Sequence, residues 1–209
     1  MNEDILFWNV DTQIDFIEPA GKLYVKGAEK LKPVLKKITD FAQESKIRVI
    51  NTCDFHFVNS QELSTTPDFK TTFPEHCMAG TSGAGFVRET NPVLPVIVDW
   101  KAHLAIIPQL ANAQQFRNIV IRKDAFDVFE GNPYTTRILN LLRPGKVFVY
   151  GVSTNVCVDK AVCGLIRLGY KVYVFEDAIK ELPKIPLPFK HWKEIGVKMI
   201  DFGKVKKYL

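Results

Sequence analysis

The sequence predicts an α/β protein, a three-layer α/β/α fold with a six-stranded, mainly parallel, Rossmann-like sheet. Short runs of β-branched and aromatic residues alternate along the chain with amphipathic segments. These runs are apolar on both faces, as parallel strands covered by helices must be. The 209 residues, 46% of them hydrophobic, are enough for one sizeable core. We therefore expect residues 1–209 to form a single domain.

Six runs are predicted to be the strands of that sheet. They are ILFWNVD (5–11), IRVINTC (47–53), NIVIRK (118–123), KVFVYG (146–151), KVYVFED (171–177) and VKMIDF (197–202). Residues 91–117 contain LPVIVDW, a candidate for an extra strand, followed by a weak helical pattern. Residues 54–86 are loop-like and too long for a mere connection, which favours a functional loop.

Two helices are predicted in the segments that connect these strands. Between the first two runs, apolar residues recur at helical spacing: Leu31, Val34, Leu35, Ile38 and Phe41. Pro33 implies that this helix starts near it or bends there. In GNPYTTRILNLLRPG, Asn132 suits an N-cap, Pro133 the first helical position, and Pro144 with Gly145 a stop.

A third helix is predicted in TNVCVDKAVCGLIRLGY, after the fourth run. Its apolar face consists of Val158, Ala161, Val162, Leu165 and Ile166. Gly169 suits the C-terminal cap, because a glycine adopts the left-handed conformation without strain. With Thr154 as N-cap, Cys157 would be the third residue of the helix.

Composition excludes several classes of protein. The 28 basic and 23 acidic residues are scattered, apart from a tail, GKVKKYL, that we interpret as solvated, so we expect no nucleic-acid partner. The acidic N-terminus is not a signal peptide, and no apolar run approaches the ~18 residues that cross a bilayer, so we expect no membrane association. Four cysteines without CxxC spacing indicate free thiols in a reducing compartment, and we expect a cytoplasmic location.

Reactive side chains follow the predicted strands where each one ends. Asp11 follows the first run, Asp54 and His56 the second, Lys123 ends the third, and residues 151–157 follow the fourth. Side chains beyond the carboxyl ends of the strands in an open parallel sheet share one crevice. The sequence therefore predicts a reactive site at this edge.

Cys157 is the candidate nucleophile of that site. At the start of a helix, unpaired backbone N–H groups and the positive end of the helix dipole stabilise a thiolate and lower its pKa below ~8.5. The same N–H groups suit an oxyanion hole. The alternative is that Cys157 is one of the many cysteines that simply pack in a core.

Asp11 and Lys123 would support that nucleophile. A desolvated carboxylate at Asp11 can take the thiol proton and later protonate a leaving amine; its rival is Asp15, and either residue can instead cap a loop or helix. The Lys123 ammonium would stabilise a thiolate and a developing oxyanion, although a lone strand-end lysine is usually a solvated charge. Alternation along the strand places Arg122 on the opposite face.

A candidate metal site lies in the long loop. Asp54 and His56 are two residues apart and project to the same side of an extended segment, and His76 can supply a third ligand. One carboxylate and two imidazoles with open positions suit zinc, iron or manganese at a catalytic site, although such a triplet also arises by coincidence. His103 and His191 lack such neighbours and are interpreted as structural or surface residues.

Six motifs in order give the chain a resemblance to a known family. NVDTQIDF, GKLYVKGA, TCDFH, FPEHCMAGTSGAGF, RKDAFDVFEGN and GVSTNVCV resemble the isochorismatase-like cysteine hydrolases, especially their nicotinamidase branch, from about residue 5 to residue 178. The resemblance implies a six-stranded parallel sheet and a catalytic trio of Asp11, Lys123 and Cys157. It also implies a homodimer or larger assembly.

The resemblance further implies a cofactor and a substrate site. A divalent metal, commonly zinc, with iron or manganese as alternatives, would bind Asp54, His56 and His76 and hold the pyridine nitrogen of the substrate. Phe16 and Phe73 would form an aromatic wall, or else belong to the core. A cis peptide would join Val152 to Ser153.

The activity implied is hydrolysis of the carboxamide nicotinamide to nicotinate and ammonia. Asp11 would activate Cys157, a thioester would form, and the N–H groups of Ser153 and Cys157 would serve as oxyanion hole. Asn155 and Val156 depart from the acidic and aromatic residues of many nicotinamidases. One alternative is therefore another small amide, ureide or carbamoyl substrate, and a second is a catalytically silent binding protein of the same fold.

Overall fold

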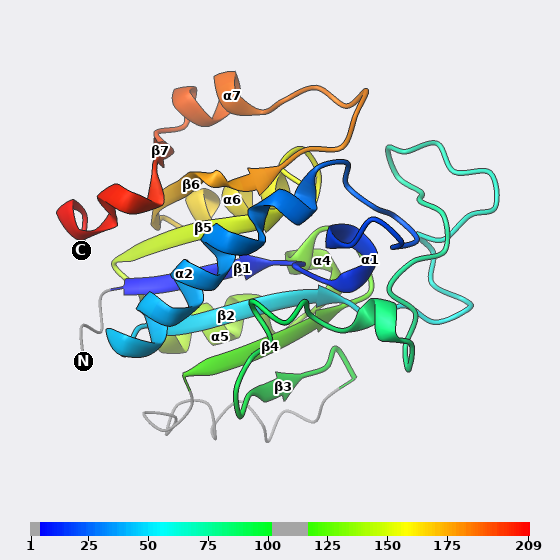
Figure 1. Cartoon of the computed structure of the whole chain (residues 1–209), viewed down its shortest axis with the longest axis horizontal. Helices are drawn as coiled ribbons and strands as arrows, with labels where there is room; N and C mark the ends of the chain where they lie inside the picture. Colours follow the sequence, from blue (N-terminus) through cyan, green and yellow to red (C-terminus); the bar gives the residue numbers. More distant parts are fainter. Residues whose placement is uncertain (1–4, 102–116) are drawn as a thin grey trace.

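The structure, a computed structural model, describes residues 5–101 and 117–209. In these ranges seven parallel strands form one sheet in the order β3-β4-β2-β1-β5-β6-β7 (Figure 1). The strands are β1 (Ile5–Val10), β2 (Arg48–Asp54), β3 (Val96–Val98), β4 (Asn118–Lys123), β5 (Lys146–Val152), β6 (Lys171–Lys180) and β7 (Lys198–Ile200). The strands that the sequence predicts are thus all present.

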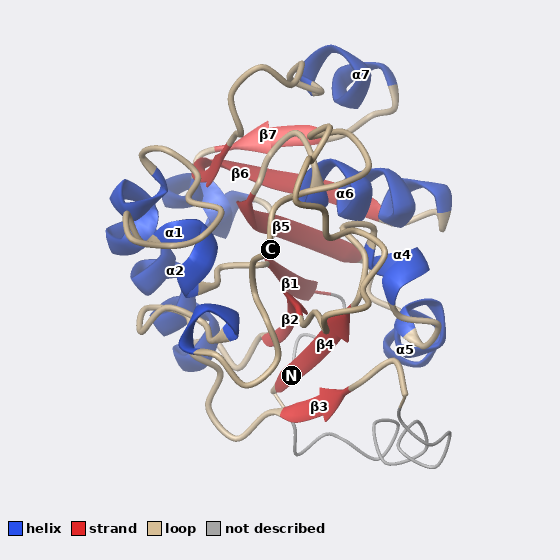
Figure 2. Cartoon of the chain, turned by 90° about the vertical axis from the view of Figure 1, so that its right-hand side faces the viewer, coloured by secondary structure: helices blue, strands red, loops and turns tan. Residues whose placement is uncertain are grey.

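Helices cover both faces of the sheet, which confirms the three-layer α/β/α prediction (Figure 2). One face carries α1 (Ile14–Ile17) and α2 (Lys32–Glu44). The other carries α4 (Val128–Gly131), α5 (Thr135–Leu142) and α6 (Cys157–Arg167). The remaining α-helix of the described chain, α7 (Phe189–Glu194), lies at the β7 edge (Figure 2).

The seventh strand is the one departure from the predicted sheet. β3 arises from the apolar stretch LPVIVDW and pairs with β4 at the sheet edge, with Val98 opposite Ile121. With three residues it is too short for period or length to identify it from sequence. Most of the weak helical pattern that follows lies in residues 102–116, outside the described residues, as does His103.

β1 shows why the strands are apolar on both faces. All six of its residues are buried, because helices cover the sheet on both sides. On one face Phe7 packs against the rings of Phe41, on α2, and Phe148. Trp8 points the other way and stacks on Phe129, on α4. The core therefore occupies both interfaces between sheet and helices.

Pro33 lies in the first turn of α2, so it starts this helix rather than bending it. A short 3₁₀ helix, Ala28–Leu31, leads into α2. The predicted apolar face is correct: Leu35 and Ile38 are fully buried against the sheet. The second predicted helix needs a larger correction.

Asn132 does not cap α5, which begins at Thr135. Its side chain accepts a hydrogen bond from the N–H of Tyr134 and donates to the carbonyl oxygens of Val98 and Arg122. The local motif is an Asx turn tied to two strands, and these tertiary bonds move the helix start past Pro133. The helix ends as predicted, just before Pro144.

The basic tail is less solvated than predicted. Residues Phe202–Lys207 form a 3₁₀ helix in which Val205 is buried, and Tyr208 packs on the ring of Tyr173. All four cysteines carry free thiols, as expected. Among the helices that the structure describes, none combines the length and the apolar character that crossing a membrane requires.

Candidate active site

The predicted gathering of reactive residues at one edge of the sheet is confirmed. β4, β2, β1 and β5 are neighbours in the sheet, so their carboxyl ends lie side by side (Figure 1). Asp54 and Lys123 are paired partners at the ends of β2 and β4. Asp11 directly follows β1, and Ser153 follows β5. The topology, rather than any local motif, therefore assembles this site.

The structure brings Asp11, Lys123 and Cys157 together. Lys123 Nζ lies 3.0 Å from Asp11 Oδ2 and 3.9 Å from Cys157 Sγ. One carboxylate oxygen of Asp11, one of Asp54 and the Cys157 sulfur lie within 4.8 Å of one another. Asp11 and Lys123 are fully buried and Cys157 is 6% exposed. A thiol, a carboxylate and an ammonium thus meet in a site shielded from water.

Asp11, and not its rival Asp15, faces this centre. The Asp11 carboxylate accepts a 2.6 Å hydrogen bond from the Thr52 hydroxyl, which fixes one oxygen and leaves the other to Lys123. The Asp15 carboxylate instead accepts the backbone N–H groups of Lys22 and Cys77. Asp15 therefore holds two loops together, which is the loop-capping role predicted as the alternative to catalysis.

The start of α6 differs from the prediction. The helix begins at Cys157 itself, so Cys157 is its first residue and not its third. Thr154 does not cap it: its N–H donates to the Lys180 carbonyl, and its buried hydroxyl has no hydrogen-bond partner in residues 5–101 and 117–209. The β5–α6 connection is tighter than the capped turn that the sequence predicts.

That tight connection leaves two N–H groups free beside the sulfur. The Val152–Ser153 peptide is cis, as the family resemblance implied. In the described part of the chain, neither the N–H of Ser153 nor that of Cys157 has a hydrogen-bond acceptor. A first helical residue has no intrahelical acceptor for its N–H. The geometry is compatible with the predicted oxyanion hole.

The Cys157 thiol is not pre-ionised, contrary to the prediction. Burial raises its pKa well above the ordinary value; the Lys123 ammonium opposes this, but the charges of Asp11 and Asp54 add to it. Desolvation therefore outweighs the helix dipole on which the sequence argument relied. The resting thiol keeps its proton and needs a base.

Asp11 has the electrostatics of such a base. Burial raises the pKa of its carboxyl above the ordinary range, although Lys123 acts to lower it, and the charge of Asp54 raises it further. For Lys123, burial alone would lower the pKa, but Asp11 and Asp54 outweigh burial and hold the ammonium charged. Arg122 lies on the opposite face, as predicted, over the Phe55 ring and near Asp99.

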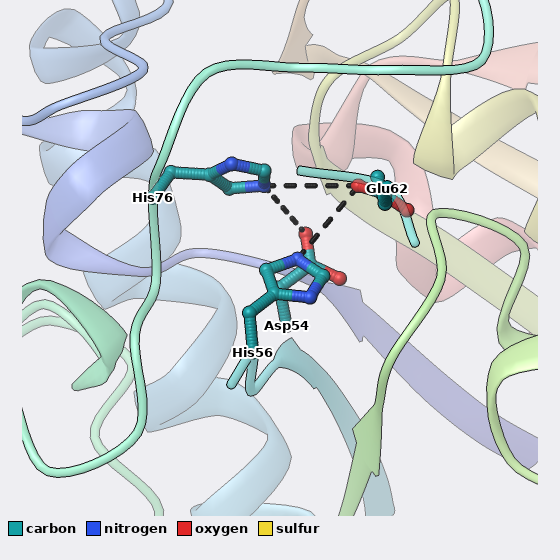
Figure 3. A group of neighbouring side chains, drawn as sticks. All are labelled: Asp54, His56, Glu62 and His76. Atoms are coloured by element: carbon teal, nitrogen blue, oxygen red, sulfur yellow. Dashed lines mark ion pairs between the residues drawn. The ribbon is translucent and has the colours of Figure 1, made fainter. Parts of the chain in front are cut away.

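Asp54, His56 and His76, the predicted metal ligands, also lie together, and Glu62 joins them (Figure 3). All four side chains are buried. His76 Nε2 lies 3.6 Å from Asp54 Oδ2 and 3.7 Å from Glu62 Oε1, and His56 Nε2 lies 3.7 Å from the same Glu62 oxygen. Four potential ligand atoms therefore face one point.

This donor set fits a divalent metal. His56 Nε2 and Asp54 Oδ2 are buried and have no hydrogen-bond partner among the described residues, which is costly unless something binds them. Ligands about 2.0 to 2.2 Å from a tetrahedral zinc ion lie roughly 3.3 to 3.6 Å apart. The three spacings given above are close to this, and all four ligand atoms lie within 4.8 Å of one another. Burial lowers the pKa of His56, so its imidazole is neutral, the form that binds metals.

Residues outside the cluster hold both imidazoles in place. The Asp124 carboxylate lies 3.0 Å from His56 Nδ1 and also accepts the Ser60 hydroxyl. The Pro74 carbonyl lies 2.7 Å from His76 Nδ1. Each histidine is thereby oriented with Nε2 toward the centre, the arrangement that fixes metal-binding histidines. His191, by contrast, is exposed on α7, in keeping with the surface role expected of it.

Sequence reasoning missed Glu62 and Asp124. Glu62 lies in the long loop at no motif spacing, and its burial, with the nearby Asp54 charge, raises the pKa of its carboxyl to about 7. Asp124 directly follows Lys123 at the end of β4, so the strand-end rule could have identified it.

A narrow pocket joins the two clusters. It is lined by Cys157 and by Asp54, Glu62 and His76 of the metal cluster. Its walls are mostly apolar, and they are formed by Phe16, Leu23, Phe73, Phe126, Val156 and Leu182. The predicted wall residues Phe16 and Phe73 do line it, with ring centroids 5.3 and 6.3 Å from that of His76.

Comparison with known proteins places the chain in a known family. A profile of the isochorismatase domain matches residues 100–186. The chain is 32% identical over 174 residues to the nicotinamidase/pyrazinamidase of Mycobacterium tuberculosis, covering 80% of this chain and 82% of that protein. It is 26% identical over 188 residues to the nicotinamidase of Escherichia coli, covering 82% and 80% respectively. A crystal structure of Pyrococcus horikoshii pyrazinamidase in complex with zinc superposes with a TM-score of 0.73 and 23% identity, over 95% of this chain and 99% of that one.

The fold and these similarities define a class, the enzymes that hydrolyse amide C–N bonds. Within that class the chain belongs to the isochorismatase-like hydrolase family, in its nicotinamidase branch. The resemblance seen in the six sequence motifs is confirmed.

Proposed function

We propose that this enzyme hydrolyses nicotinamide to nicotinate and ammonia through a thioester on Cys157. The observation that carries the proposal is the position of Lys123 Nζ, 3.0 Å from Asp11 and 3.9 Å from the Cys157 sulfur. Cys157 in turn lines a pocket together with Asp54, Glu62 and His76 of the metal cluster. The curated relatives named above, a nicotinamidase/pyrazinamidase and a nicotinamidase, support the choice of substrate.

The first half of the reaction forms the thioester. Asp11 takes the proton from Cys157, and the thiolate attacks the carbonyl carbon of the amide. The negative charge that develops on the carbonyl oxygen is stabilised by Lys123 and by the N–H groups of Ser153 and Cys157. Asp11 then gives its proton to the amide nitrogen, the C–N bond breaks, and ammonia leaves.

The second half releases the acid. Asp11, again a carboxylate, takes a proton from a water molecule, and the resulting hydroxide adds to the thioester carbon. The C–S bond breaks, Asp11 returns the proton to the Cys157 sulfur, and nicotinic acid leaves and gives its carboxyl proton to the solvent to become nicotinate. The raised pKa of Asp11 suits this double role, since an acid–base catalyst works best with a pKa near the operating pH.

A divalent metal belongs beside this trio. Asp54, His56 and His76 would hold it, with Glu62 as a fourth ligand, and zinc is our first choice because of the zinc-bound relative; iron or manganese also suit the donors. Bound there, the ion would supply a Lewis acid for the ring nitrogen of the substrate. Asp124 and the Pro74 carbonyl keep the histidine rings pointed at the site.

The pocket favours a small, flat substrate. Phe16, Phe73 and Phe126 line it, and their aromatic rings suit stacking against a flat ring. The single seven-stranded sheet supports the prediction that residues 1–209 form one hydrolase domain. The cytoplasmic location and the homo-oligomeric state stay predictions.

The test is ammonia release from a panel of substrates at matched concentrations. We expect nicotinamide and its analogue pyrazinamide to be hydrolysed fastest, and the variant Cys157→Ala to be inactive. A preference for a ureide or N-carbamoyl compound would contradict the assignment of nicotinamide as substrate. It would favour the alternative, a family member that acts on ureides or carbamoyl compounds. No turnover of any compound by metal-loaded enzyme would favour a silent binding protein.

A further inference from the structure

One side chain next to the nucleophile holds a distant segment over the pocket. The Asn155 amide donates to the carbonyl oxygens of Leu182 and Ile185, at 2.9 and 2.8 Å, and its oxygen accepts the N–H of Leu182 at 3.0 Å. Asn155 is 9% exposed, so water does not compete for these bonds. We call residues 182–187, between β6 and α7, the pocket strap.

Asn155 is the main anchor of this strap. Pro183 and Pro186 have no N–H to donate, and the prolines keep the segment out of helix and sheet. Within the described residues, every hydrogen bond made by the backbone of the strap goes to Asn155. Removing that amide would leave the strap held by apolar contacts alone.

The strap supplies a wall of the substrate pocket. Leu182 is 8% exposed and lines the pocket together with Val156 and Cys157. Asn155 itself is not among the residues that line the pocket. It therefore acts on the pocket through Leu182, which it grips at both the N–H and the carbonyl oxygen.

We propose that Asn155 is a positioning residue for substrate selectivity. By fixing Leu182 against the pocket it limits the enzyme to carboxamides with one small flat ring. This inference rests on the proposed function, since it concerns the same pocket and substrate class. The amide suits this position: an aspartate would keep the bond to the Leu182 N–H but would face two carbonyl oxygens without a proton to share.

The test compares two substrates in four variants. Nicotinamide and quinoline-3-carboxamide differ by one fused ring, and the ratio of their kcat/KM values measures how tightly the wall is placed. We expect Asn155→Ala, Asn155→Asp and Leu182→Ala each to shift this ratio about tenfold or more toward the larger amide, the scale of a lost packing contact in a pocket. The matched control is Leu187→Ala, a half-exposed leucine of the same strap that should leave the ratio unchanged.

A double variant separates positioning from folding. If Asn155 acts through Leu182, the shift in Asn155→Ala/Leu182→Ala should stay close to that in Leu182→Ala, because both changes remove one wall. A lower Tm in Asn155→Ala with an unchanged ratio would overturn the proposal, as would an equal fall in kcat/KM for both amides.

A second readout does not depend on the substrate being nicotinamide. In a Cys163→Ser background, alkylation of Cys157 by the bulky N-phenylmaleimide relative to iodoacetamide, followed by peptide mass spectrometry, reports the width of the pocket. We expect Asn155→Ala to raise this relative rate about tenfold. If the wild type releases no ammonia from nicotinamide but the alkylation ratio still rises in Asn155→Ala, the proposed function is wrong and the positioning role of Asn155 is supported. An unchanged alkylation ratio in Asn155→Ala would contradict the positioning role of Asn155, whatever the substrate is.

Discussion

The site has two halves that are built in different ways. Asp11, Lys123 and Cys157 stand at or just beyond the ends of strands, and the register of a buried parallel sheet fixes where they meet. His56, Glu62 and His76 stand on the irregular stretch after β2, where contacts such as the bridge between His56 and Met78 hold the loop. The first half depends on the register of the sheet, whereas the second depends on local backbone and side-chain hydrogen bonds within the loop.

This difference suits the two halves to different roles, chemistry in the first and binding in the second. Groups that exchange protons and form a covalent bond need fixed distances, which a sheet provides. Groups that bind a metal and a substrate ring tolerate adjustment, because the bound ion itself draws the ligands together. Changes in the strand-end half should therefore affect turnover and folding, and changes in the loop half should affect metal binding and KM.

The largest effect is expected at the sulfur. Cys157→Ala should lower kcat for nicotinamide by about 10⁴-fold or more, since removal of a nucleophile leaves only binding and oxyanion stabilisation. The measurement is steady-state ammonia release with metal-loaded protein. Cys163→Ala, six residues further along α6, is the matched control and should keep nearly full activity; equal losses in both variants would contradict the assignment.

Lys123→Met should show how strongly the strand-end half is tied to folding. Without the ammonium, the buried Asp11 and Asp54 carboxylates lose their partner, and breaking such a buried pair costs about 3 to 5 kcal/mol of the free energy of unfolding. Urea unfolding of metal-free protein measures this cost. The control, Lys36→Met, removes an exposed ion pair with Asp40 and should change the free energy of unfolding by no more than about 1 kcal/mol.

His76→Ala should affect the loop half and spare the trio. We expect the zinc content of the purified protein to fall well below one equivalent and KM for nicotinamide to rise about 10- to 100-fold. Alkylation of Cys157 by iodoacetamide should persist, which shows that the trio is intact. His191→Ala, on the exposed side of α7, is the control for histidine loss, and unchanged zinc content in His76→Ala would refute the metal assignment.

Asp124→Asn tests the support of the metal site. The amide can still accept a bond from His56 Nδ1, but without the charge that makes the imidazole a stronger ligand, so zinc affinity should fall by about 10-fold. Competition with a chromophoric chelator measures the affinity directly. Asp99→Asn, whose carboxylate faces Arg122 instead, should bind zinc like the wild type.

The pH dependence should carry the signature of Asp11. Its pKa is raised from the ordinary 3.8, and the carboxylate is the active form, so kcat/KM should be lost as the pH falls through a value above 3.8. The profile for nicotinamide, measured at saturating zinc over a pH range in which the protein stays folded, locates this acid limb. A limb at or below 3.8 would contradict the role of Asp11 as the buried base.

The same division explains what the sequence could predict. Strands follow from hydrophobic pattern, and the rule that their carboxyl ends share one crevice leads directly to Asp11, Lys123 and Cys157. Glu62 follows from no such rule, because its place depends on how a long loop closes over the sheet. The metal triplet follows from the two-residue spacing of Asp54 and His56 and from the later His76, and the family resemblance implies the same three ligands.

Three local predictions failed where tertiary contacts replaced the local ones. The Asn132 side chain bonds to an adjacent turn and to β3 and β4, and it does not cap α5. Thr154 gives its N–H to β6 and does not cap α6. The helix dipole argues for a lowered Cys157 pKa, but burial of the side chain outweighs it and raises the pKa. In each case contacts or burial contributed by distant parts of the chain outweigh the local sequence preference.

The central claim is that Cys157 becomes covalently acylated during turnover. Rapid acid quench of the enzyme in the first turnovers with nicotinamide, followed by intact-protein and peptide mass spectrometry, tests it directly. We predict an adduct with the mass of a nicotinoyl group on the peptide that contains Cys157, absent from the Cys157→Ala variant. Full ammonia release with no adduct on that peptide, or the same adduct in the alanine variant, would contradict the account.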